Sequence, residues 1–299
     1  MEREYWFVIL SAILYGTMTV GGQFFINAGL SIYEISLYPA IFISFILLPV
    51  VLTKRKYLIK REMFSFFIFY GFITALLALT EFGGIVFGVP VAIVALLLYS
   101  QPIWTIVFGK LILKEQITSI KIIAIVSALA GVIILLKPWN IESVITARGI
   151  ISSLLGGVFL SLWIIWGRIS GINKQNYITT TIGYMGFSAI WLLVLWPFVA
   201  FFIHEPTIIR LSTSFETQNW LFLAFFAIMA HMVPYFFFYK GVQKVNSSTA
   251  GIILLLEPIS AAILAAILFA QPIDLDLLYG GTLILLSNYL LISKDRIPA

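Results

Sequence analysis

Long apolar stretches recur along the whole chain, and they limit its fold more than any other feature does. Ten can be marked, each close to the roughly 20 residues that an α-helix needs to cross a bilayer core. We expect these helices at residues 5–26, 35–52, 63–86, 91–113, 119–136, 149–167, 178–203, 220–239, 249–269 and 277–292. Only 10% of the 299 residues are charged, against about 25% in soluble domains. The chain is therefore predicted to be an all-α integral membrane protein without a soluble catalytic domain.

Rare or missing residue types exclude several kinds of site. The chain has no cysteine, which rules out disulfides, thiolate metal ligands and cysteine nucleophiles. Its two histidines, His204 and His231, are far apart in sequence, and it has no P-loop, H-E-x-x-H or G-x-S-x-G motif. We expect no metal, no cofactor, no built-in ATPase and no enzymatic activity. The N-terminus lacks a net-positive start and a clear cleavage site, so it is interpreted as a retained first helix.

The basic residues are distributed unevenly between the predicted loops. If the N-terminus is cytoplasmic, 15 of the 18 lysines and arginines fall on the cytoplasmic side, and only Lys137, Arg148 and Arg210 fall outside. Because basic loops favour the cytoplasm, we expect a multi-pass protein of the cell membrane with both termini cytoplasmic. The net charge of +5 follows this topology, so no nucleic-acid partner is expected.

The second half of the chain repeats features of the first half at a shift of 156 residues. Pro102 then coincides with Pro258, and this match is informative because proline is costly inside a helix. An odd number of helices per half makes the second half enter the membrane from the opposite face. We therefore predict two inverted five-helix repeats, residues 1–140 and 141–299. Inverted repeats commonly build carriers with a site near the midplane.

Several short motifs resemble those of the EamA branch of the drug/metabolite transporter superfamily. They are Tyr15-Gly16-Thr17, residues 91–102 ending in Gln101-Pro102, Leu113-Lys114-Glu115, Ala130-Gly131-Val132, residues 252–258 ending in Glu257-Pro258, and Phe269-Ala270-Gln271. The resemblance covers essentially the whole chain and implies ten helices, inverted halves and a central cavity. The sequence departs from the family pattern at Gln271, where an acid is usual, and at Tyr15, where tryptophan is frequent. Substrates in this family include amino acids, drugs and other metabolites, so the resemblance does not name one.

The candidate substrate-binding residues are polar and aromatic side chains near the bilayer centre, where such groups usually face a cavity or a partner. They are Tyr15, Tyr99, Gln101, Trp163, His231 and Glu257. Glu257 can bind a cation or carry a proton, or it can be a neutral structural acid. Gln101 can orient a solute or clasp two helices. His231, on the same helix face as Tyr235, is either titratable or structural.

The cavity is expected between the first, third, fourth, sixth, eighth and ninth helices. A few of the deeper aromatic residues can grip an apolar or cationic solute through their ring faces, but ordinary packing is the expected role of any single one. Glu81, toward the outer end of the third helix, is interpreted either as a gate residue or as an acid at the membrane interface.

Together these features predict a secondary transporter that moves a small organic solute by alternating access, as an exporter or an exchanger. The expected partners are that solute, the lipid bilayer and, if transport is coupled, protons; monomer and homodimer are both open. A channel is the first alternative, although no filter-like motif is visible, and a membrane-embedded enzyme is the second. Flux saturation and counterflow would separate a carrier from a channel.

Overall fold

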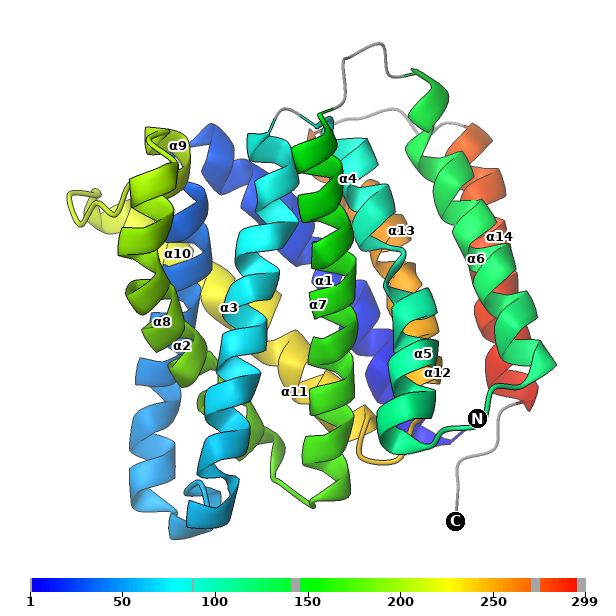
Figure 1. Ribbon diagram of the computed structural model, residues 1–299, viewed down its shortest axis with the longest axis horizontal. Helices are drawn as coiled ribbons and strands as arrows, with labels where there is room; N and C mark the ends of the chain where they lie inside the picture. Colours follow the sequence, from blue (N-terminus) through cyan, green and yellow to red (C-terminus); the bar gives the residue numbers. More distant parts are fainter. Residues whose placement is uncertain (1, 88, 141–145, 270–274, 295–299) are drawn as a thin grey trace.

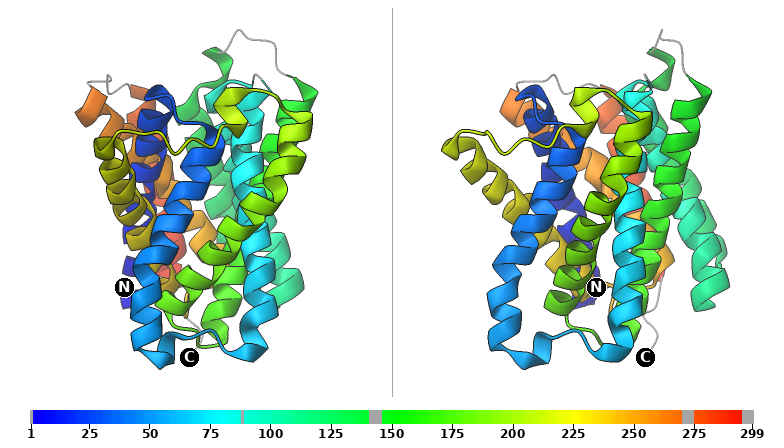
Figure 2. Two further views of the ribbon diagram at one scale, coloured as in Figure 1. Left: turned by 90° about the vertical axis from the view of Figure 1, so that its left-hand side faces the viewer. Right: turned by 60° about the vertical axis from the view of Figure 1, so that its left-hand side comes forward.

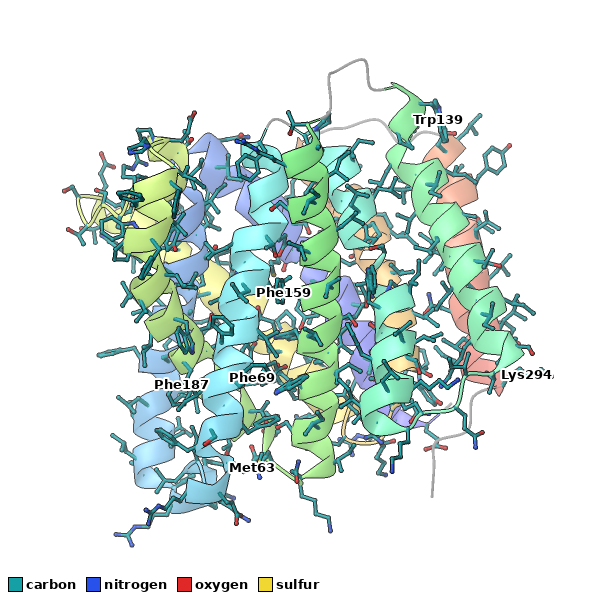
Figure 3. All side chains as sticks on the ribbon, in the orientation of Figure 1. Met63, Phe69, Trp139, Phe159, Phe187 and Lys294 are labelled. Atoms are coloured by element: carbon teal, nitrogen blue, oxygen red, sulfur yellow. The ribbon has the colours of Figure 1, made fainter. Side chains whose placement is uncertain are left out.

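The computed structural model describes residues 2–87, 89–140, 146–269 and 275–294 (Figure 1). These residues contain no strand, and they form ten helical segments that are long and apolar enough to span a membrane. The predicted all-α fold and the ten predicted spans are therefore confirmed. Apolar side chains such as Phe69, which is half exposed, project from the outer surface of the bundle, as the lipid-facing surface of a membrane protein requires (Figure 3).

Seven of the spans are continuous α-helices. They are α1 (Arg3–Asn27), α2 (Ile32–Thr53), α3 (Phe64–Val86), α6 (Ser119–Leu136), α7 (Ala147–Ile172), α8 (Tyr177–Phe202) and α14 (Leu275–Lys294). The other three spans are interrupted. The fourth consists of α4 (Val91–Leu98) and α5 (Gln101–Leu113), the eighth of α10 (Thr217–Phe226), a π-helical segment (Ala227–Met232) and α11 (Val233–Gly241), and the ninth of α12 (Ser247–Ile253), a 3-10 turn (Leu254–Leu256) and α13 (Glu257–Phe269). A short helix, α9 (Pro206–Ile209), lies between α8 and α10.

A proline follows each interruption. Pro102, Pro234 and Pro258 are each the second residue of the helix that resumes after the break. Proline has no N–H to bond the carbonyl one turn earlier, so the preceding turn loses a hydrogen bond and can adopt another geometry. The breaks at Pro102 and Pro258 occupy equivalent places in the two halves of the sequence.

The long helices pack across the two halves of the chain. Helix α6 packs against α14, α3 packs against α7, and α1 packs against α11 and α13. In Figure 1, α1 rises from the lower edge of the bundle whereas α7 descends from the upper edge. The contacts of α1 with the eighth and ninth spans mirror those of α7 with the third and fourth spans. This pairing agrees with the predicted inverted repeat, which stays a prediction.

Both described ends of the chain lie at one end of the bundle, which we call the termini end (lower edge of Figure 1); the other is the far end. Figure 2 shows α9 and the beginning of α10 at the far end. At the termini end, the Lys244 ammonium lies 2.7 Å from the Glu4 carboxylate. That hydrogen bond raises the pKa of Lys244 because it favours the charged ammonium.

Carboxylates fasten the loops at both ends. At the termini end, Glu115 accepts four hydrogen bonds of 2.6–3.1 Å from the backbone N–H groups and hydroxyls of Ser247 and Ser248. At the far end, Glu34 accepts hydrogen bonds of 2.7 Å from the backbone N–H groups of Ser31 and Ser212. Glu34 therefore holds the α8–α10 loop against the start of α2, and Glu115 holds the start of α12 against the α5–α6 loop.

Candidate functional site

A cavity of about 190 Å³ lies among α1, α2, α3, α4, α8, the π-helical segment and α13. The lining comes mainly from the parts of these helices nearer the far end: residues 18–26, 35–40, 74–81 and 185–192. Most of the lining is apolar. The cavity therefore reaches from the middle of the bundle toward the far end.

The helices around this cavity differ from those predicted. The second and seventh spans, α2 and α8, contribute to its lining, and the sixth span, α7, does not. The reason is close packing of α7 against α3 and α4. A Cβ atom added at Gly157 would lie 3.0 Å from the Leu97 carbonyl oxygen, and one at Gly156 would lie 3.4 Å from the Glu81 backbone. No space for a solute is left between these helices.

Two carboxylates give the cavity its electrostatic character. Glu257, the first residue of α13, accepts a hydrogen bond of 2.9 Å from the Thr19 hydroxyl of α1, and Tyr99 lies beside it. Glu81, near the end of α3, lines the same cavity. None of the described lining residues is lysine or arginine. In its ionised form, either carboxylate attracts a cation and repels an anion.

His231 adds an unpaired polar atom to the lining. It lies in the π-helical segment and is 8% exposed. Its Nδ1 lies 3.1 Å from the Tyr235 hydroxyl, so the two side chains share a face as predicted. Its Nε2 has no hydrogen-bond partner in the described part of the chain. Because buried polar atoms are nearly always hydrogen-bonded, this nitrogen is available to a bound solute.

An aromatic cluster closes the cavity toward the termini end. Its seven members, all at most 7% exposed, are Tyr15, Tyr70, Trp163, Tyr184, Tyr235, Phe238 and Tyr239. The rings of Trp163 and Phe238 stack with centroids 4.6 Å apart. The Tyr70 hydroxyl donates to the Trp163 carbonyl at 2.8 Å and lies 2.6 Å from the Tyr239 hydroxyl. We call this group the inner aromatic cluster, and its rings are packed against one another beside the cavity.

The six predicted site residues fall into three groups. Tyr99, His231 and Glu257 line the cavity. Tyr15 and Trp163 lie next to it in the inner aromatic cluster.

Gln101 has a different position from the other five. Its side-chain amide is buried, donating to the Gly251 carbonyl at 2.6 Å and accepting from the Thr105 hydroxyl at 2.8 Å. Gln101 thus joins α5 to α12, which is the second of its two predicted roles, a clasp between helices. Gln271, where the sequence departs from the family pattern, lies outside the described residues.

Sequence reasoning did not select Thr19 or Thr74, and it left Glu81 between two interpretations. A periodic signal was present in both helices. Residues 15, 18, 19, 22 and 26 share one face of α1, and residues 74, 77, 78 and 81 share one face of α3. Each face carries a polar side chain near the bilayer centre. Both faces line the cavity, and Tyr15 on the α1 face belongs to the inner aromatic cluster.

Ten spans around an internal, partly polar cavity define the class: a multi-pass membrane protein with room for a solute between its helices. The sequence matches the EamA-like transporter family over residues 3–137 and 147–293, and the chain belongs to that family. An uncharacterized transporter of Clostridium kluyveri is 22% identical, with 99% of this chain and 95% of the relative aligned. YyaM of Bacillus subtilis, also an uncharacterized transporter, is 24% identical over 68% of this chain and 65% of its own length.

A solved crystal structure has the same fold. It superposes with a TM-score of 0.74 at 13% identity, covering 95% of this chain and 94% of its own. At that identity the likeness concerns the fold alone. The family match and the ten apolar spans together make this chain a multi-pass membrane transporter.

Proposed function

We propose that this transporter moves a small organic cation across the cell membrane, with the far-end cavity as its substrate site. The observation that carries the proposal is the presence of Glu81 and Glu257 in the cavity without a described lysine or arginine. A carboxylate in a membrane interior is costly unless it is neutralised. A cationic solute would neutralise it, and the ring faces of Tyr99, Tyr235 and Phe226 would contact the solute's apolar part.

Alternating access is supported by the closure at one end. A channel needs a path that is open to both sides at once, whereas the inner aromatic cluster fills the space between the cavity and the termini end. We assign this arrangement to an outward-facing state, with both termini in the cytoplasm as the distribution of basic residues predicts. Inward opening requires the inner aromatic cluster to separate while the far end closes.

Proton exchange is the proposed source of energy. Glu257 can hold a proton or a cationic group, but not both. If the carrier changes state only when the carboxylate is neutralised, each inward movement of a proton permits one outward movement of substrate. The protein would then be an exporter that works by exchange.

The test is transport in proteoliposomes with an imposed and then a removed proton gradient. The probes are labelled quaternary ammonium compounds and amines, with neutral and anionic solutes of similar size alongside. Saturable, gradient-dependent movement and counterflow of the cations are expected. Exclusive transport of anionic or neutral solutes would contradict the proposed substrate class, and non-saturable flux without counterflow would contradict the carrier mechanism.

Two substitutions connect this test to the cavity. Glu257→Gln keeps the size of the side chain but cannot exchange a proton, so it should abolish gradient-driven accumulation while leaving substrate exchange measurable. Glu62→Gln is the matched control, because the Glu62 side chain is 74% exposed outside the spans. A folded Glu257→Gln variant that still accumulates substrate with unchanged pH dependence would exclude Glu257 as the proton carrier.

A further inference from the structure

A second cavity, of about 540 Å³, lies at the termini end and shares no lining residue with the first. It is bounded by the end of α5 and the loop to α6, the last turns of α7, Asn246 before α12, and Lys294 at the end of α14. Figure 3 shows Lys294 at the lower end of the α6–α14 pair, at the edge of the bundle. The proposed transport function uses only the first cavity and does not explain the second.

The lining of the second cavity is strongly basic. It contains Lys114, Lys121, Arg168 and Lys294, with Glu115 as the acid among its described residues. Both oxygens of Glu115 already accept hydrogen bonds at the start of α12. Within the described ranges, none of the four cations forms a salt bridge. Among the described lining residues, four basic side chains therefore face a single acidic one.

Lys121 makes this imbalance costly. Its side chain is only 2% exposed, and its ammonium donates to two neutral oxygens, the Gln116 carbonyl at 3.2 Å and the Ser248 hydroxyl at 2.9 Å. Glu115 accepts a hydrogen bond of 2.6 Å from that hydroxyl. A buried ammonium without a direct counter-ion is expensive. An anion in the adjacent cavity would lower that cost.

We propose that this cavity binds the phosphate group of an anionic phospholipid. Lysine and arginine donors around one concave space suit phosphate, whose oxygens accept several charge-assisted hydrogen bonds. Apolar residues beside the cavity point to a lipid as the source of the phosphate. Ile172 lines the cavity and is 52% exposed, and Leu111, one turn before Lys114, is 71% exposed. Basic pockets between transmembrane helices at the cytoplasmic side are suited to lipid head groups.

A head group in this position would act on the conformation. The cavity joins the ends of α5, α7 and α14 to the starts of α6 and α12, so the ligand would fasten five spans to one another. A ligand that binds one conformation better shifts the population toward it. Anionic lipid is therefore expected to favour the state in which the termini end is closed.

The test measures the thermal stability of the full-length protein in mild detergent. The additives are phosphatidylglycerol, phosphatidylcholine as the uncharged comparison, and inorganic phosphate. A saturable rise in Tm with phosphatidylglycerol alone identifies a lipid site. A rise with inorganic phosphate as well supports the phosphate site and shows that the acyl chains are not needed. A rise with inorganic phosphate alone overturns the lipid assignment, and no rise with either anion overturns the site itself.

Variants locate the effect. Lys121→Gln and Lys294→Gln should each weaken the response to phosphatidylglycerol about fivefold, which corresponds to ~1 kcal/mol for one basic residue near a lipid surface. Lys294 is exposed at a helix end, so its variant tests the site even if Lys121→Gln fails to fold. Lys110→Gln is the matched control, because Lys110 is an exposed lysine of α5 outside the cavity. Equal losses in the Lys110 and Lys294 variants would show a diffuse surface effect and refute the site.

Discussion

The crossing of α1 and α13 allows the packing beside the substrate cavity to be tested directly. A Cβ atom added at Gly16 would lie 2.3 Å from the Ser260 hydroxyl oxygen and 2.7 Å from the Ala261 backbone nitrogen. The hydroxyl can rotate away, but the backbone of α13 cannot. Ordinary contacts lie at about 3.5–4.0 Å, so Gly16→Ala must push the two helices roughly 1 Å apart. Overpacking of this kind costs about 1–3 kcal/mol of unfolding free energy.

The same separation reaches the proposed substrate site. Thr19 follows Gly16 by one turn of α1, and Glu257 precedes Ser260 by one turn of α13. The hydrogen bond between Thr19 and Glu257 is 2.9 Å long, and a displacement of roughly 1 Å would break it. We therefore expect Gly16→Ala to lower both stability and substrate affinity.

Gly22→Ala is the matched control for the stability part of this prediction. It lies on the same helix, but a Cβ atom there would meet nothing within 4 Å. Alanine is favoured over glycine in a helix by up to about 1 kcal/mol, so the control should be neutral or slightly stabilised. The measurement is the unfolding free energy from SDS titration in mixed micelles. If Gly16→Ala is as stable as Gly22→Ala, the close crossing of the helices is wrong.

Three further predictions concern other parts of the chain. Glu115→Ala removes a carboxylate that accepts four hydrogen bonds and should lower the unfolding free energy by at least ~1.5–3 kcal/mol, measured in the same titration; an unchanged value would contradict its role at α12. Ser188→Cys should react with a membrane-impermeant thiol reagent from outside the cell and Ser161→Cys should not, because Ser188 lines the cavity and the chain has no native cysteine. Equal labelling of both would exclude an outward-facing cavity. A reporter fused after residue 299 should be active only in the cytoplasm, since 15 of the 18 basic residues fall on the predicted cytoplasmic side; external activity would refute the proposed orientation.

The spans were predictable because they depend on a strong and local property. A helix that crosses a bilayer must be about 20 residues long and apolar, and the ten stretches in the sequence meet that condition. The positions of Pro102 and Pro258 were also visible, and each removes a backbone hydrogen bond. The breaks themselves were not, because Pro39 and Pro197 lie inside continuous helices. The spans and the proline positions need no knowledge of how the helices pack.

The lining of the cavity was harder to predict, because both lipid and an apolar cavity accept the same residue types. Periodicity separates a polar face from an apolar one, and α8 has no strongly polar face. Its contribution through Met185, Ser188 and Leu192 therefore gave little signal. The aromatic residues illustrate the same problem, since Tyr99 lines the cavity whereas Trp163 packs in the inner aromatic cluster beside it. Only the packing of the helices distinguishes these positions.

The two halves of the chain also differ in a way that bears on transport. At the shift of 156 residues, Tyr70 corresponds to Phe226, Tyr239 to Gly83 and Tyr235 to Leu79. The hydroxyl pair between Tyr70 and Tyr239, 2.6 Å apart, therefore has no equivalent in the other half.

Closure at the far end would thus lack a bond that closure at the termini end possesses. The sequence asymmetry therefore favours the state in which the termini end is closed and the cavity faces outward. Tyr70→Phe keeps the ring but removes a hydroxyl that bonds both the Trp163 carbonyl and the Tyr239 hydroxyl. The loss of two hydrogen bonds worth about 0.5–1.5 kcal/mol each shifts the balance toward the inward-facing state by about 5- to 160-fold. Labelling of Ser188→Cys from outside should slow by a corresponding factor where the inward-facing state becomes dominant. Adding Tyr239→Phe to Tyr70→Phe should then have little further effect on the labelling rate. Independent, additive effects of the two substitutions would show that the hydroxyl pair does not bias the carrier.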